Sequence, residues 1–139
     1  MLPAAGTVGP VVDAYEIADV EVAVLTGTGQ RNRLYELTGP RALTFTQCIE
    51  DIAEALGRPV KYTAVPIDDY IGALDEQGVP AELQWLLREL FTVVFDGRNS
   101  NVMPGVEQAL NRPATDFKDY VRKTIETGVW NTDTQRESA

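Results

Sequence analysis

Residues 33–60, RLYELTGPRALTFTQCIEDIAEALGRPV, carry the pattern of a strand, a turn and a helix in one continuous run. The segment RLYEL (33–37) contains β-forming side chains, and the TGPRA that follows interrupts the extended backbone. Thr44 and Gln47 have the spacing of a capping box, and apolar side chains then recur at helical spacing until Gly57. The stretch therefore predicts a short strand followed by an amphipathic helix.

Upstream of this unit, the sequence predicts another strand and another helix. Residues 8–12 form a short apolar run typical of a strand. Asp13 has the place of a helix N-cap, and Glu16, three residues later, has the place that completes a capping box. Apolar side chains continue at helical spacing to Thr26, where a glycine-containing turn follows.

Downstream, the sequence predicts one strand and four helices. Residues 59–66, PVKYTAVP, indicate the strand, which a proline ends. Helices are predicted over 67–77, 80–94 and 106–110, and a last helix follows Thr115 as its N-cap. The helix over 80–94 has the strongest apolar periodicity in the chain.

These elements define an expected fold class and domain organisation. A chain of 139 residues has the length of one domain. We expect an α+β fold that is rich in helices, with five or six of them and a small sheet of two to four short strands. We expect residues 1–130 to form this domain and residues 131–139 to be a disordered tail.

The composition disfavours several classes of partner. The chain carries 12 lysines and arginines against 21 aspartates and glutamates, a net charge of −9, which disfavours nucleic acid and anionic membrane surfaces. No apolar run approaches the roughly 18 residues of a membrane span, and the N-terminus lacks the basic region of a signal peptide. Cys48 is the single cysteine, so no internal disulfide is expected. We expect a cytoplasmic location.

Familiar catalytic and cofactor motifs are absent from the sequence. The chain has no histidine, which excludes Ser-His-Asp and Cys-His nucleophile systems and histidine metal sites. Cys48 lies on an apolar helix face and is interpreted as an inert thiol. The glycines of GTGQRN (27–32) follow a helix and precede a strand, whereas a dinucleotide fingerprint needs the opposite order. Tyr120 and Lys123 are one residue too close for a Tyr-x-x-x-Lys pair. We therefore predict no catalytic, cofactor-binding or metal-binding residue.

Apolar side chains on the predicted helices over 67–77 and 80–94 are the candidates for a binding groove that holds a small molecule. These groove candidates are Tyr70, Leu74, Leu83, Trp85, Leu87 and Phe91. The alternative is that the same side chains are ordinary core residues. Trp85 lies off the leucine stripe, which suits either an exposed interface or a helix that is buried on two sides.

Several motifs, in their order and spacing, resemble the C-terminal half of the NmrA-like family of atypical short-chain dehydrogenases. VVDAYEIADV, which begins at Val11, is similar to one family motif, and YELTGPRALT with LGRPV is similar to the next. LNRPATDFKDYV, residues 110–121, resembles the closing segment of the family. The resemblance covers residues 8–127.

The resemblance implies a function that this sequence carries only in part. Full members of the family have an N-terminal Rossmann domain that binds NAD(P)(H) through a glycine-rich turn, and this sequence does not contain that half. It corresponds to the substrate-side lobe. We expect a small-molecule-binding or protein-interaction domain that is non-catalytic alone. The alternative is part of a split or truncated NAD(P)H-dependent oxidoreductase, with NAD(P)H as cofactor only when a Rossmann half is present.

The resemblance also implies an unsatisfied surface. In the family, the segment 33–37 is a late strand of a parallel sheet whose other strands come from the missing half. Unpaired strand edges and helix faces that once covered a sheet both need a partner. We expect a homodimer formed through this surface, and a small apolar ligand as a further partner.

Overall fold

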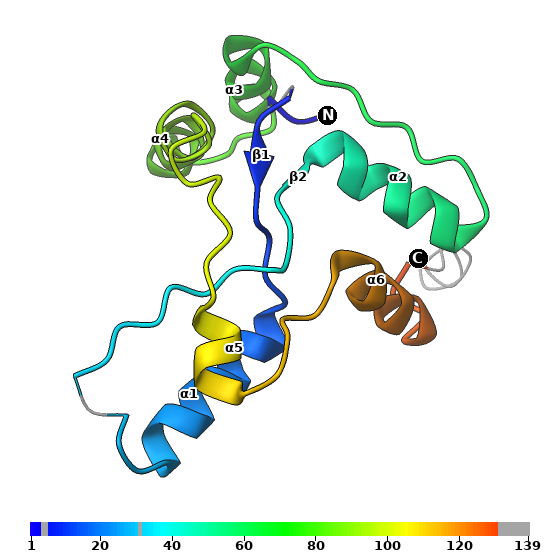
Figure 1. Cartoon of the computed structure of the whole chain (residues 1–139). Coiled ribbons are helices and arrows are strands. Elements are labelled where there is room, and N and C mark those ends of the chain that lie inside the picture. Colours follow the sequence, from blue (N-terminus) through cyan, green and yellow to red (C-terminus); the bar gives the residue numbers. More distant parts are fainter. Residues whose placement is uncertain (4–5, 31, 131–139) are drawn as a thin grey trace.

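The computed structural model describes residues 1–3, 6–30 and 32–130 of the chain. Within them it contains six α-helices, one π-helical turn and a two-stranded sheet, arranged as in Figure 1. In chain order the elements are β1 (Val8–Gly9), α1 (Ala14–Thr26), β2 (Leu43–Thr44), α2 (Phe45–Leu56), α3 (Ile67–Glu76), α4 (Ala81–Glu89), the π-helical turn η1 (Leu90–Val94), α5 (Gly105–Leu110) and α6 (Phe117–Glu126). The predicted helix-rich α+β fold is confirmed. The tail predicted at 131–139 lies outside the described residues.

The sheet is one short antiparallel pair. Val8 of β1 lies opposite Thr44 of β2, and Gly9 lies opposite Leu43, whose side chain is buried. β2 leads directly into α2, so this pairing fixes the position at which α2 begins (Figure 1). The strand predicted over 8–12 is thus present but shorter than expected.

The strands predicted over 33–37 and 59–66 are not formed. Segment 33–37 makes a single antiparallel bridge, to Pro104, and segment 59–66 makes a single parallel bridge, to Leu2. Leu34 is 84% exposed. A β-forming sequence becomes a strand only where a neighbour completes its backbone hydrogen bonds, and the described residues provide one only at these bridges.

The helices pack in pairs instead of surrounding one large core. α1 packs on α5, α2 packs on α6, and α3 packs on α4. In Figure 1, α1 and α5 lie at the lower end of the molecule, and α3 and α4 lie at the upper end. Because each pair contacts the others only in part, the arrangement leaves several helix faces open.

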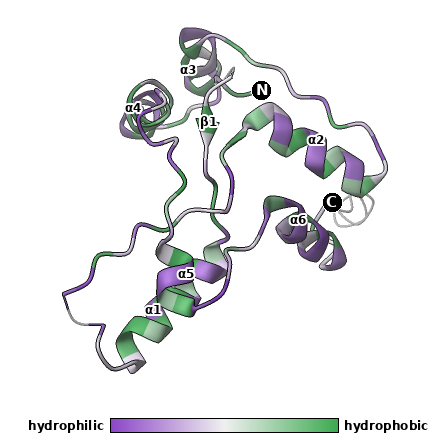
Figure 2. Ribbon diagram, in the orientation of Figure 1, coloured by the Kyte–Doolittle hydropathy of each residue, from purple (hydrophilic) through white to green (hydrophobic). Residues whose placement is uncertain are grey.

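Few apolar side chains are buried in the part of the chain that the structure describes. They are Val20, Leu43, Val106 and Val121. On α1, by contrast, large apolar side chains stay in solvent, and Leu25 is 83% exposed. Figure 2 shows hydrophobic residues over much of α1 at the lower end of the molecule. A domain of this size normally buries such surface, so α1 presents a face without a partner.

The predicted N-cap residues are confirmed at α1 and α2 but not at α6. Asp13 caps α1, and Thr44 forms a complete capping box with Gln47 at the start of α2. At α6 the N-cap is Asp116 and not Thr115 as predicted. The one-residue shift has a physical cause, because the backbone and hydroxyl groups of Thr115 are hydrogen-bonded to a carboxylate from α1.

Candidate functional site

A buried carboxylate joins α1 to the segment that precedes α6. Glu16 is 2% exposed, and its oxygens accept hydrogen bonds from the Arg112 guanidinium, from the Thr115 amide at 2.9 and 3.0 Å and from the Thr115 hydroxyl at 3.0 Å. Arg112 also donates to Asp19 at 2.9 Å. The hydrogen bond to Glu16 raises the pKa of Arg112. Glu16 therefore turns into the protein, and its predicted role as the capping-box partner of Asp13 is wrong.

A second ionic cluster joins the TGPRA turn to α2 and α6. Arg41 donates to Asp116 at 2.6 and 3.0 Å and to Asp51 at 2.9 Å. Lys118 lies 2.9 Å from Glu54 and 3.5 Å from Asp51. The hydrogen bond from Arg41 lowers the pKa of the Asp116 carboxyl. The cluster thus holds α6 against α2 and fixes the direction in which α6 leaves the turn.

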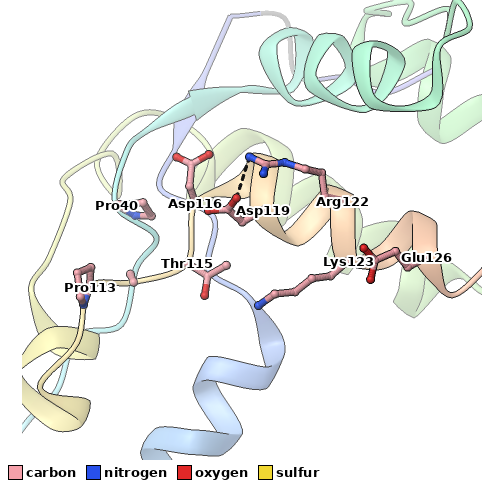
Figure 3. Close-up of a pocket in the computed structure, with 9 residues that line it drawn as sticks. Pro40, Pro113, Thr115, Asp116, Asp119, Arg122, Lys123 and Glu126 are labelled. Atoms are coloured by element: carbon pink, nitrogen blue, oxygen red, sulfur yellow. Dashed lines mark ion pairs between the residues drawn. The ribbon is translucent and has the colours of Figure 1, made fainter.

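A polar hollow of about 730 Å³ opens beside α6. Its lining comes from the TGPRA turn, the segment before α6 and α6 itself, and consists of Pro40, Pro113, Ala114, Thr115, Asp116, Asp119, Arg122, Lys123 and Glu126. In Figure 3 the ion pair between Arg122 and Asp119, at 2.8 Å, crosses the surface of α6, and the side chain of Lys123 extends toward α1. The lining mixes both signs of charge and holds neither histidine nor cysteine.

The structure places the six groove candidates on three consecutive elements. Tyr70 and Leu74 lie on α3, Leu83, Trp85 and Leu87 on α4, and Phe91 on η1. The rings of Tyr70 and Phe91 meet edge to face, with 5.7 Å between centroids. Leu83 is exposed, and Trp85 is 63% exposed. The structure therefore brings Tyr70 and Phe91 together and leaves Leu83 and Trp85 on the outer surface. None of the six candidates lines the polar hollow beside α6 or the apolar hollow beside β1.

An aromatic cluster continues from this groove toward the sheet. Phe91 stacks with Phe95 at 6.0 Å between centroids, and Phe45 meets Phe95 edge to face at 5.5 Å. Phe95 in turn lines an apolar hollow beside β1. Phe95 was not among the predicted site residues, although its spacing of four residues from Phe91 is a signal that indicates it.

The hydrogen-bond cluster around the buried Glu16 was also not predicted, and no pattern near Glu16 in the sequence indicates it. Glu16 and Arg112 are 96 residues apart in the sequence, and only the packing of α1 on α5 brings them together. Glu16 has the spacing of a capping residue, which is the reading that short-range rules favour.

The part of the chain that the structure describes also bears on metal binding, on thiol reactivity and on membrane spanning. No group of three or more acidic, histidine or cysteine side chains is placed to hold a metal ion among residues 1–3, 6–30 and 32–130. Cys48 is half-buried, and burial raises the pKa of its thiol, with the charge of Asp51 acting in the same direction. Among the described helices, none is long and apolar enough to cross a membrane.

Two curated proteins with similar sequences are reductases. The chain is 32% identical over 111 residues to the NAD(P)H azoreductase of Xenophilus azovorans, which covers 80% of this chain and 39% of that protein. It is 32% identical over 109 residues to a (4-alkanoyl-5-oxo-2,5-dihydrofuran-3-yl)methyl phosphate reductase of Streptomyces griseus, which covers 78% of this chain and 38% of that protein. The chain thus spans about two fifths of the length of these relatives. No protein-family model matches the chain.

Solved structures of reductases share the fold. The triphenylmethane reductase of Citrobacter superposes with a TM-score of 0.75 at 21% identity, over 90% of this chain and 43% of that one. The quinone oxidoreductase QOR2 of Escherichia coli, complexed with NADPH, superposes with a TM-score of 0.77 at 22% identity, over 90% of this chain and 44% of that one. The chain is therefore related to NAD(P)H-dependent reductases and has the fold of their C-terminal part.

Proposed function

We propose that this chain is the substrate-side lobe of an NAD(P)H-dependent reductase and that it is non-catalytic alone. The observation that carries the proposal is the unequal coverage of the match, which includes about four fifths of this chain but about two fifths of each reductase relative. The nucleotide-binding half would then come from residues outside this sequence, in a longer polypeptide or in a separate one. In this proposal the chain binds a small molecule, and the nucleotide-binding half binds NAD(P)H.

The glycine pair that comes nearest to a dinucleotide fingerprint lies at the C-terminal end of a helix. Gly27 and Gly29 come closest to a fingerprint, but Gly27 is the C-cap of α1, with its amide bonded to the Ala23 carbonyl at 2.9 Å. Pyrophosphate binds at the N-terminal end of a helix, where free amides and the helix dipole attract negative charge. The C-terminal end of α1 has the opposite polarity. The chain's own contribution would be to bind the acceptor and to exclude water around it.

The open surface of α1 and of the segment 33–37 supports an assembly. Tyr15, Val22 and Leu25 of α1 are exposed, as is Leu34 in the extended segment that was expected to be a strand. A nucleotide-binding half that offered a sheet edge would pair this backbone and cover these side chains. Without that half, the same surface favours a second copy of the chain. A homodimer that binds a small apolar molecule or a protein is therefore the second candidate function.

Native mass spectrometry separates the two candidates. We would record spectra of the purified chain alone, with NADPH, and after coexpression with the nucleotide-binding half of a reductase relative. The proposal predicts no NADPH adduct for the chain alone and a one-to-one complex in which NADPH is bound and oxidised by an added quinone. An NADPH adduct of the chain by itself would contradict the proposal. A homodimer that forms no complex with the coexpressed nucleotide-binding half would also contradict it. Val22→Asp should block assembly, whereas Trp85→Asp, on the distant α4, serves as the matched control.

A further inference from the structure

We propose that the apolar hollow between β1 and η1 is the binding site for one aromatic ring of the acceptor molecule. The hollow has a volume of about 200 Å³ and is lined by the residues of β1 and those just after it, by Val94 and Phe95, and by the loop that holds Asn99. This assignment names the substrate class and rests on the proposed function. The site itself belongs entirely to this chain.

One wall of the hollow is an aromatic ring held in a fixed position. Phe95 is stacked on Phe91 with an interplanar angle of 24°, and Phe45 meets it nearly at right angles, at 67°. Two neighbouring rings therefore restrict its rotation. Aromatic pairs prefer offset-stacked or edge-to-face arrangements, so a preset phenyl wall favours a second ring over an aliphatic chain.

Gly9 makes room for this wall. A Cβ atom at position 9 would lie 3.3 Å from Cε1 of Phe95, closer than an ordinary van der Waals contact. A glycine inside a strand weakens the strand, and it often marks a place where another group approaches the backbone closely. Here the approaching group is the Phe95 ring, so the missing side chain of Gly9 sets the width of the hollow.

The π-helical turn positions both the Phe95 ring and Asn99, which is the one polar side chain among the lining residues. The Phe95 amide donates to the Leu90 carbonyl at 2.9 Å, which closes the wide turn of η1. The side-chain amide of Asn99 donates to the Val94 carbonyl at 3.1 Å and is held there. Single π-helical turns occur frequently at functional sites. An apolar hollow with one oriented polar group matches the usual chemistry of a small-molecule site.

The volume decides what fits. An enclosed apolar cavity of about 150 Å³ is large enough to bind benzene. Pockets for whole drug-sized ligands measure roughly 300–1,000 Å³. At about 200 Å³ the hollow suits one six-membered ring with a small polar substituent that can reach the Asn99 amide. The rest of a larger acceptor would extend out of the hollow.

Binding of 4-fluorophenol to the chain tests the site, observed by fluorine NMR of the probe and by amide chemical shifts of the protein. We expect millimolar affinity, with shifts concentrated at Val8, Val94, Phe95 and Gly97. Val94→Trp, at a partly exposed lining position, should fill the hollow and weaken binding about tenfold or more. Leu86→Trp adds the same side chain at an exposed position of α4 outside the hollow, and should leave binding unchanged.

Several results would overturn the assignment. One is the absence of any spectral response to 4-fluorophenol at 10 mM, which is about the weakest binding that such spectra detect. The others are chemical-shift changes confined to α3 and α4, and an equal loss of affinity in both tryptophan variants. Gly9→Ala is the second test if Val94→Trp does not fold, and it should also weaken binding. The measurement uses neither NADPH nor a nucleotide-binding half. A failure here therefore leaves the proposed reductase role standing, and a failure of assembly leaves the ring site standing.

Discussion

Replacing Glu16 by alanine should destabilise the chain by about 3 kcal/mol, a large fraction of the stability of a domain of this size. The Thr115 amide and hydroxyl would lose their charged acceptor inside the protein, and each hydrogen bond to a charged group contributes about 1.5–3 kcal/mol. The loss from Arg112 is smaller, because its side chain is partly exposed and water can replace the carboxylate. The estimate therefore rests on the two donors of Thr115 and takes the lower end of their combined range of about 3–6 kcal/mol, because Thr115 is itself only half-buried.

Urea unfolding followed by far-ultraviolet circular dichroism measures this change. Glu21→Ala is the matched control, since Glu21 is an exposed glutamate on the same helix and its loss should stay within about 0.5 kcal/mol. In an Arg112→Ala background, Glu16→Ala should cost less than in the wild type, because the two side chains interact directly. A Glu16→Ala variant within about 0.5 kcal/mol of the wild type would refute the reasoning.

Four further predictions concern other parts of the molecule. Arg41→Ala should cost about 1 kcal/mol at neutral pH, measured by urea unfolding, because Arg41 is partly exposed. The lowered pKa of Asp116 stabilises the fold above the unfolded aspartate pKa of about 3.9, and this stabilisation disappears as the pH falls through the folded pKa. In acid titrations, Arg41→Ala should therefore be less stable than the wild type at pH 7, and this difference should be much smaller at pH 2. An equal difference at both pH values would contradict the ion pair between Arg41 and Asp116. Gly57→Ala should lower the melting temperature through a loss of about 1 kcal/mol, since Gly57 has φ of 62°, and an unchanged melting temperature would argue against that conformation. Cys48 should react with Ellman's reagent well below the rate of a free thiol at pH 8, because burial raises its pKa, whereas full reactivity would show that the thiol is accessible. Val22→Asp should convert a homodimer of the isolated chain to monomer in native mass spectra, and a persistent dimer would place the interface elsewhere.

The helix boundaries were predictable because their determinants are local. Thr44 and Gln47 cap α2 through hydrogen bonds within one turn, and Gly57 ends it in the left-handed conformation. Asp13 caps α1 in the same way. At α6 the local rule missed by one residue, since Thr115 was already hydrogen-bonded to a distant carboxylate.

The candidate site was predictable only in fragments. Tyr70 and Phe91 were placed on one groove from helical spacing, and their rings do meet. Trp85, proposed for the same groove, lies in solvent, because the packing of α3 on α4 does not reach that face of α4. The hollow beside Phe95 depends on the π-helical turn, and that turn widens the helix in a way that an apolar periodicity of 3.6 residues does not reveal.

The sequence by itself determined the fold class, the helix positions and the relation to the C-terminal part of NAD(P)H-dependent reductases, since each depends on neighbouring residues or on ordered motifs. Only the tertiary structure decided that RLYEL forms a single bridge instead of a strand, that Glu16 is a buried anchor for Arg112 and Thr115, and that the Phe95 ring lies against Gly9 beside an apolar hollow. These features arise from groups far apart in the chain. A strand needs a neighbour and a buried charge needs a partner, and which group fills either role is settled when the elements pack.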